Sequence, residues 1–244
     1  MIGFTLKSPR ISLLNHHEVS LKMHTKPICG KVFAGAGSVV QVISALVSTL
    51  LLASCGVGWE NKPVKPEVRM QVANGANVIG EIIITLEPEK APISVANFLA
   101  YVNSGFYGGT VFHRIGPNLT GALRMIQGGG FVQGTSSLVL KTPTRAAIEL
   151  EVGKGLSNVQ WSIAMARTAA PNSATSQFFI NYFNNTELDT SGGGYAVFGT
   201  VTGGFNVVNA IAGVSPCTAR VGVTDVPYCT PNTNITIVSA VQTK

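Results

Sequence analysis

The stretch Val111–Ile115, with the sequence Val-Phe-His-Arg-Ile, constrains the fold of this chain more than any other. Its β-branched and aromatic residues follow the turn signal Gly108-Gly109, and this pattern predicts a β-strand over residues 110–115. Arg114 lies inside that apolar strand. Because a guanidinium keeps its proton, the strand face that carries it needs a hydrogen-bonding partner or a water-filled cavity. A structural arginine bonded to buried carbonyl groups and a functional arginine both satisfy this condition.

A second apolar run follows at Met125–Phe131, Met-Ile-Gln-Gly-Gly-Gly-Phe, and predicts a strand over 124–127. Gln127 offers both a hydrogen-bond donor and an acceptor. The glycines after it allow a ligand or another backbone to come close. Taken alone, the two stretches fit a structural strand pair as well as they fit a binding site.

Three further blocks favour the binding site: Ser162–Arg167 (Ser-Ile-Ala-Met-Ala-Arg), Ser173–Ile180 (Ser-Ala-Thr-Ser-Gln-Phe-Phe-Ile) and Gly194–Gly199 (Gly-Tyr-Ala-Val-Phe-Gly). In this order, and preceded by Phe-His-Arg-Ile and Gln-Gly-Gly, they resemble the cyclophilin family of peptidyl-prolyl cis/trans isomerases. The resemblance covers roughly residues 68–241. It implies a mainly β fold, a closed eight-stranded antiparallel β-barrel capped by two helices, and an enzyme that accelerates rotation about X–Pro bonds.

The apolar pattern predicts elements that fit an antiparallel barrel. The turn signal Asn74-Gly75-Ala76-Asn77 separates strands at 68–72 and 81–86, which indicates a hairpin. A helix begins at Pro92 and ends at Gly105, because its apolar residues recur at helical spacing from 95 to 102. The later elements are expected in this order: a loop-rich region to about 158, strands at 160–166, 177–181 and 196–201, a short helix closed by Gly213, and a last strand at 235–241.

Prolyl isomerisation places few demands on a catalytic site. Amide resonance sets a rotational barrier near 18–20 kcal/mol, and lowering it needs no nucleophile, metal or cofactor, so we expect none. A site that binds the twisted amide better than the planar one is sufficient. Twisting localises a lone pair on the prolyl nitrogen, and Arg114 is suited to donate to it because its guanidinium is always charged and carries several donors.

The resemblance also implies which residues form the site. Carried over position by position, it assigns catalysis to Arg114, Gln127 and Phe179. It assigns substrate binding to a larger set, which comprises Phe112, His113, Met125, Ala166, Arg167, Thr168, Gln177, Leu188 and Tyr195. Other interpretations stay open: Phe112 and Phe179 as barrel core, His113 as a structural histidine, and Gln177 as scaffold.

Two departures from the family pattern affect this assignment. Eleven residues, Gly116–Ile126, separate the Phe-His-Arg-Ile and Gln-Gly-Gly motifs, where the family has about six. Arg124 stands where a pocket phenylalanine usually precedes the methionine, so we expect Leu119 or Leu123 to fill that space.

The second departure is at the rim of the site. Glu187 stands where many eukaryotic members have a tryptophan, and a tyrosine at 195 resembles bacterial periplasmic members. In members with that tryptophan, its indole N–H bonds the inhibitor cyclosporin. The sequence therefore predicts weak inhibition of this chain.

Residues 1–54 are typical of a lipoprotein signal peptide, with Met23 as an alternative start. Lys26 and Lys31 precede an apolar run of 15 residues from Val39 to Ala53, which is shorter than a membrane span. The run leads into Leu-Ala-Ser-Cys, which resembles a lipobox with Cys55 as the lipidated residue. A signal-anchor helix with a chance cysteine is the alternative. Residues 55–67 are predicted to be a tether and 68–244 the isomerase domain.

Two cysteines remain within the predicted domain, Cys217 and Cys229. In an exported protein they suggest a disulfide, with two free thiols as the alternative. A zinc site is not expected, because no Cys-x-x-Cys pair or nearby histidine accompanies them.

The net charge of the chain limits the classes of binding partner that we expect. The formal charge of +6 falls to +2 without residues 1–54, because 12 basic and 10 acidic residues remain. This balance, with no clustered basic patch, argues against a nucleic-acid surface. We expect a monomer in the bacterial cell envelope, facing the periplasm and bound to a membrane through its lipid alone.

The sequence thus favours a lipid-anchored isomerase that acts on proline-containing polypeptide segments of folding envelope proteins. The rival hypothesis is a catalytically weak proline-binding chaperone or assembly module that uses the same groove. The long loop at 116–126 favours the rival, and the intact Arg114, Gln127 and Phe179 favour the enzyme.

Overall fold

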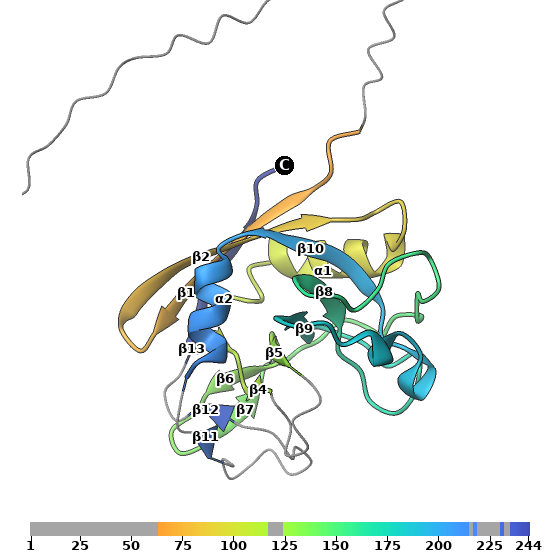
Figure 1. The fold of residues 1–244 in the computed structure, drawn as a ribbon. Helices are drawn as coiled ribbons and strands as arrows, with labels where there is room; N and C mark the ends of the chain where they lie inside the picture. Colours follow the sequence, from red (N-terminus) through yellow and green to blue (C-terminus); the bar gives the residue numbers. More distant parts are fainter. Residues whose placement is uncertain (1–62, 117–123, 215–216, 219–229, 232–234) are drawn as a thin grey trace, which may run out of the picture. The chain divides into compact units, whose positions relative to one another are not determined.

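A computed structural model describes residues 63–244 except 117–123, 215–216, 219–229 and 232–234 (Figure 1). Several sequence predictions lie outside the described residues: the signal peptide and most of the tether with Cys55, the loop residues Leu119 and Leu123, and Cys229. The side chain of Cys217 is not described either, so its disulfide stays a prediction. None of the helices in the described ranges is long and apolar enough to cross a membrane.

The domain opens with the expected hairpin. Strand β1 (Glu67–Asn74) pairs antiparallel with β2 (Asn77–Leu86) across the turn at Gly75-Ala76. Every second residue is buried, as in Val68, Met70 and Val72 of β1, because successive side chains of a strand point to opposite faces. This alternation is why the sequence pattern located the pair.

In the part of the chain that the structure describes, two helices pack against the sheet, as predicted. Helix α1 (Pro92–Asn103) starts with proline at its first turn, where no backbone donor is lost. Its N-cap residue, Ala91, has no side chain for capping, and the carboxylate of Glu151 instead accepts from the backbone N–H of Ile93 at 3.0 Å and of Ser94 at 2.6 Å. Helix α2 (Phe205–Ala212) lies along β2 (Figure 1) and buries Val207, Val208 and Ile211.

Within the described residues, eleven strands form one antiparallel sheet, in the order β4-β5-β9-β8-β10-β2-β1-β13-β3-β6-β7. The remaining members are β3 (Thr110–Val111), β4 (Arg114–Ile115), β5 (Met125–Gly128), β6 (Phe131–Gln133), β7 (Leu138–Leu140), β8 (Ser162–Met165), β9 (Phe178–Asn181), β10 (Val197–Gly203) and β13 (Ile235–Gln242). A separate pair joins β11 (Cys217–Thr218) to β12 (Thr230–Pro231). Short 3₁₀ turns η1 (Thr186–Asp189) and η2 (Ser191–Gly193) precede β10.

The mainly β class, the antiparallel sheet and the two helices are confirmed, but the eight-stranded closed barrel is not matched in detail. The segment expected as one strand at 110–115 changes partner midway. β3 pairs with β13 and β6, whereas β4 pairs with β5. Between them the Phe112 N–H donates to the Ile235 carbonyl and the His113 N–H to the Gln127 carbonyl. The sheet therefore curls strongly, because the continuous segment 110–115 pairs with strands near opposite ends of the sheet order.

The β6–β7 hairpin was missed by the sequence analysis, which expected a loop-rich region there. Each strand has three residues, too few for an alternating pattern to stand out from a loop.

A cluster of aromatic rings lies within the main core. Phe178 contacts Phe98, Tyr107 and Phe112 edge-on, with centroids 5.4–6.2 Å apart. Each edge-on pair of this kind contributes about 0.5–1.5 kcal/mol to stability, beyond the contribution of the apolar area that it buries. Phe112 is 1% exposed and belongs to this core, so the structure places it among the core residues rather than in a substrate groove.

Candidate active site

A cavity of about 90 Å³ lies on the face of the sheet where β4, β5, β9 and β8 are neighbours. Eight of the twelve residues predicted from the sequence line it: Arg114, Met125, Gln127, Ala166, Arg167, Phe179, Leu188 and Tyr195. These residues come from segments up to 81 positions apart in the chain, and the curled sheet brings them together.

Strand register places three of the key side chains in a row. Arg114 is the partner of Gln127 across β4 and β5, and Gln127 is the partner of Phe179 across β5 and β9. Partners in register present their side chains on the same face of a sheet. The row therefore sets a charged donor, an amide and an aromatic ring side by side.

The apolar wall of the cavity is a small cluster separate from the main core. It consists of Met125, Ala164, Ala166, Phe179, Leu188 and Val197, with Tyr195 packed against it. The ring of Phe179 meets that of Tyr195 at 5.7 Å and 78°. Phe179 is thus buried in the wall of this cavity and not in the main core.

Two glutamines hold Arg114 in position. Its Nη1 donates to Oε1 of Gln127 at 2.7 Å, and Nε2 of Gln127 donates to Oε1 of Gln177 at 2.9 Å. Because Gln177 accepts from the amide nitrogen, the amide oxygen of Gln127 faces the guanidinium. A Cβ at Gly130 would come within 2.5 Å of the Gln177 side chain. Glycine at this position therefore leaves room for the Gln177 side chain that bonds Gln127. Gln177 acts on the site through Gln127 and does not line the cavity.

His113 is buried, with its ring 4.6 Å from that of Phe131. The pKa of His113 is lowered from 6.5 to about 4, mainly by burial and to a smaller extent by the positive charge of Arg114, while hydrogen bonds act in the opposite direction. The ring is therefore neutral at physiological pH and does not line the cavity. This agrees with a structural histidine rather than an acid or base.

Arg167 uses its guanidinium to hold the loop that carries Tyr195. Nε and Nη2 donate to the Gly194 carbonyl at 3.0 and 2.7 Å, and Nη2 also donates to the Gly192 carbonyl at 2.6 Å. The guanidinium carbon lies 4.5 Å from the centroid of the Tyr195 ring. Gly194 has φ +90°, and a Cβ there would meet the Asp189 carbonyl at 2.5 Å. The loop geometry therefore requires glycine at this position.

The segment expected to pair with substrate backbone is partly engaged within the protein. The Ala166 N–H donates to the Gln177 carbonyl at 3.0 Å, and the Thr168 N–H and hydroxyl both bond Oγ of Ser173. Thr168 is exposed and lies outside the residues that line the cavity.

A buried polar network behind the cavity was missed by the sequence analysis. Asp189 accepts from the hydroxyl of Ser157 and from the backbone and side-chain nitrogens of Asn158, the latter two at 2.7 and 2.8 Å. Burial alone would raise the pKa of Asp189, but these donors outweigh it and leave the pKa lowered. Asn158 also donates to the Tyr195 carbonyl at 3.2 Å.

The same network continues to the start of β5. Asn181 donates to Asn158 and to Ser162, and Asn185 donates to Asn181 and to the Arg124 carbonyl. The network thereby fixes the ends of three segments that carry Leu188, Tyr195 and Met125. Its members come from 157–162, 181–189 and 124, and no local motif connects these segments in the sequence.

The two departures from the family pattern are exposed residues that directly precede Met125 and Leu188 of the cavity wall. Arg124 is exposed, with its guanidinium 4.5 Å from the centroid of the Phe183 ring, and it does not line the cavity. Glu187 is exposed on η1, next to Leu188. In the described part of the chain, no group of three or more His, Cys, Asp or Glu side chains could hold a metal ion.

The comparisons with known proteins agree with this geometry. Residues 68–241 match the family model described as cyclophilin type peptidyl-prolyl cis-trans isomerase. The chain is 48% identical over 153 residues to a peptidyl-prolyl cis-trans isomerase, cyp18, of Streptomyces antibioticus, covering 61% of this chain and 86% of that protein. It is 46% identical over 154 residues to peptidyl-prolyl cis-trans isomerase B of Escherichia coli K12, covering 61% and 87%.

Solved structures share the fold. A cyclophilin type isomerase of Cryptosporidium parvum aligns with a TM-score of 0.56 and 24% identity, over 74% of this chain and 98% of that one. The same protein solved in the presence of the dipeptide Ala-Pro aligns with a TM-score of 0.55 and 25% identity, over 73% and 99%. The family match covers most of the chain and includes every residue of the cavity, and the chain therefore belongs to the cyclophilin-type peptidyl-prolyl cis-trans isomerases, a family of isomerase enzymes.

Proposed function

We propose that this chain accelerates cis/trans rotation of X–Pro bonds in polypeptides, with Arg114 as the group that binds the twisted amide. One observation carries the proposal. Arg114 lines a cavity that has an apolar wall of Met125 and Phe179, and Gln127 holds its guanidinium there. The Ala-Pro dipeptide used with the related Cryptosporidium structure supports proline-containing peptides as substrates.

The mechanism follows from the electronic change during rotation. As the amide leaves planarity, its resonance is lost and a lone pair localises on the prolyl nitrogen. A guanidinium donor aimed at that nitrogen binds the transition state more strongly than the planar ground state, and only such differential binding raises the rate. No bond is made or broken, so neither a proton acceptor nor a nucleophile takes part.

The rest of the cavity holds the proline ring still while the carbonyl side turns. Met125, Phe179 and Leu188 present an apolar wall that is almost fully buried, and it excludes water from the ring. Exclusion of water also strengthens the hydrogen bond from Arg114, because charges interact more strongly at low dielectric.

A protease-coupled assay on a tetrapeptide with one X–Pro bond tests the proposal. Arg114→Ala should lower kcat/KM by one to three orders of magnitude, roughly 1.4–4 kcal/mol of transition-state stabilisation. Arg114→Lys should also be slow, since an ammonium lacks the planar fork. Arg69→Ala, an exposed arginine on β1, is the control and should keep the wild-type rate. A folded Arg114→Ala protein with that rate would contradict the mechanism, and wild-type binding without turnover would support the rival proline-binding module.

We further propose that the protein is exported and lipid-anchored at Cys55, and that its substrates are folding envelope proteins. The support is the basic and apolar leader that ends in Leu-Ala-Ser-Cys. Native protein should then partition into detergent, and its N-terminal peptide should carry the mass of a lipid. Cys55→Ser should stay unprocessed or become soluble, whereas an unmodified peptide across Ser54–Cys55 in native material would refute the anchor.

A further inference from the structure

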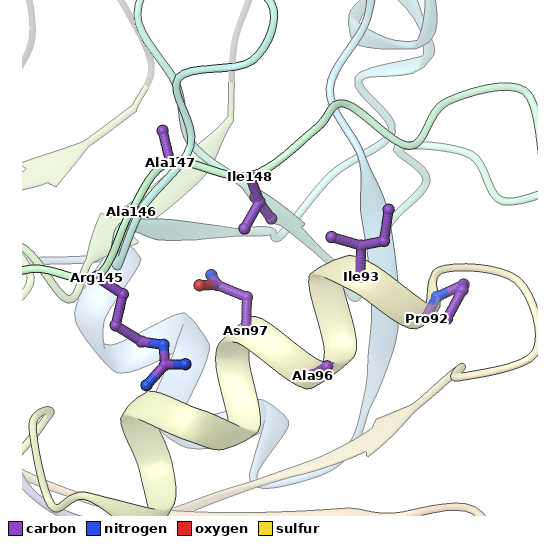
Figure 2. Close-up of a pocket in the computed structure, with 8 residues that line it drawn as sticks. All are labelled: Pro92, Ile93, Ala96, Asn97, Arg145, Ala146, Ala147 and Ile148. Atoms are coloured by element: carbon purple, nitrogen blue, oxygen red, sulfur yellow. The ribbon is translucent and has the colours of Figure 1, made fainter.

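A second groove, of about 560 Å³, runs between α1 and the segment 145–148. Figure 2 shows this segment crossing over the helix, with the side chains of Arg145 and Ile148 directed toward it. The other lining residues are mostly small or apolar: Pro92, Ile93, Ala96, Asn97, Ala146 and Ala147. We call this surface the α1 groove.

Both walls of the α1 groove are fixed in place. The Ile148 N–H donates to the Ala174 carbonyl at 2.9 Å, and the Arg145 N–H donates to the hydroxyl of Tyr101 at 2.7 Å. Asn97 on the helix donates to the Thr175 carbonyl at 2.7 Å. The groove is therefore preformed, and a ligand would not have to order it at an entropic cost.

The segment 145–148 carries backbone groups that a ligand could bond. Between its two anchored residues, the backbone N–H and C=O groups of Ala146 and Ala147 have no hydrogen-bond partner in the described part of the chain. Both residues are exposed. An extended peptide can bond such groups by strand addition, with backbone bonds for affinity and pockets for alternate side chains.

The charge of the groove favours one kind of peptide. Arg145 is the charged residue among the eight that line it, and the ion pairs of the described ranges do not include it. A carboxylate on the ligand would meet a guanidinium with no competing acid, and such a pair can form two parallel hydrogen bonds.

One short segment connects the walls of the α1 groove to the glutamine pair that holds Arg114. Ala174 and Thr175 bond to the groove walls, and Gln177, three residues beyond Ala174, bonds Gln127 in the site. Three residues span at most about 11 Å. A single polypeptide can therefore occupy both places.

We propose that the α1 groove is an exosite for the polypeptide substrate: it binds an extended segment next to the reacting proline, with small apolar side chains and one acidic residue that pairs with Arg145. This inference rests on the isomerase function proposed above. Short peptides bind the catalytic cavity alone, and longer chains gain affinity from both places, because the second contact is intramolecular once the first has formed.

The test compares short and long substrates. The short substrate is a tetrapeptide with one X–Pro bond. Two long substrates carry the same core and an Ala/Val-rich extension of about twelve residues with one Asp, placed before the core in one and after it in the other. Exchange measured by NMR should give a kcat/KM about tenfold higher for at least one long substrate. Replacing its Asp by Lys should remove most of the gain.

Variants locate the effect. Ala96→Trp fills the groove and Arg145→Glu reverses its charge, and both should abolish the gain while the tetrapeptide rate stays unchanged. Ala210→Trp makes the same change at an exposed alanine on α2 and should keep the gain. Equal rates for short and long substrates, a gain that survives both variants, or a loss on the tetrapeptide would each overturn the exosite.

A binding measurement separates this inference from the proposed activity. A fluorescein-labelled extension peptide without proline should bind the wild type and Ala210→Trp, and Ala96→Trp should weaken its Kd at least tenfold. An inactive wild type that still binds this peptide would refute the isomerase function and keep the groove as a peptide site. Absence of binding in an active wild type would refute the exosite alone.

Discussion

The guanidinium of Arg167 lies over the ring of Tyr195, with 4.5 Å between its central carbon and the ring centroid. The same guanidinium bonds the Gly192 and Gly194 carbonyls of the loop that carries this ring. Tyr195 in turn meets Phe179 edge-on. One arginine therefore positions the rim of the cavity, a role that its place in a substrate-pairing segment did not indicate.

Arg167→Ala should raise KM about tenfold and lower kcat less. Hydrogen bonds from a charged group contribute about 1.5–3 kcal/mol each when buried, and stacking on an aromatic ring adds about 0.5–2 kcal/mol. Their loss frees the loop at 191–194, so Tyr195 no longer closes the cavity. Steady-state kinetics on the tetrapeptide measure the split. Arg167→Lys should recover part of the loss, and equal falls in kcat and kcat/KM would contradict a positioning role.

Gln177→Leu should lower kcat/KM by about 3–10-fold, because Gln127 loses the acceptor that fixes its amide. One neutral hydrogen bond is worth about 0.5–1.5 kcal/mol. Gln177→Glu keeps an acceptor and should stay closer to wild type. In an Arg114→Ala background Gln177→Leu should have little further effect, since residues that act through one group are not additive. Additive losses in this double-mutant cycle would show that Gln177 acts elsewhere.

His113 should make the protein less stable in mild acid. The pKa of His113 is about 4 in the folded protein, against 6.5 for an unperturbed histidine, which stands for the unfolded chain. Between these values the unfolded chain binds a proton that the folded protein excludes. The free energy of unfolding therefore falls as the pH drops from 6.5 to 4. At about 1.4 kcal/mol per pKa unit, the free energy of unfolding should be about 3 kcal/mol lower at pH 4 than at pH 7 from this group. Urea titrations at both pH values measure it.

The control for this pH effect is His113→Gln, whose side chain does not titrate. Its stability should change less over the same interval, and the difference between the two proteins isolates the histidine. Asp189, whose pKa is lowered, acts in a separate window because its contribution is lost only as the pH falls below 3.8. Parallel stability curves for wild type and His113→Gln would disprove the assignment.

Cyclosporin should inhibit the enzyme only weakly. Glu187 is exposed on η1, beside Leu188 of the cavity wall, and an ionised carboxylate has no donor to offer the drug. Relative to a tryptophan at this position, the lost hydrogen bond, the lost aromatic contact and the carboxylate desolvation together cost about 3–4 kcal/mol, a factor of a few hundred in affinity. Inhibition titrations should show partial recovery in Glu187→Trp. Tight inhibition of the wild type would show that Glu187 does not occupy the position that tryptophan has in other family members.

The sequence by itself determined the elements whose patterns repeat locally. The β1–β2 hairpin, both helices and the strands around Arg114, Gln127 and Phe179 follow from alternation, helical spacing and turn residues, which depend only on neighbours in the chain. The family motifs added the identity of the site. Eight of the twelve residues they indicated do line one cavity.

Only the tertiary structure decided what each side chain contacts. Phe112 and Phe179 look alike in the sequence, yet one packs in the barrel core and the other in the pocket wall, because the sheet curls and the strand at 110–115 changes partners midway. The hydrogen bonds from Arg167 to the loop at 191–194 and the bonds between Asp189 and Asn158 join segments 25 or more residues apart. Such contacts are set by the packing of distant strands, for which a local pattern carries no signal.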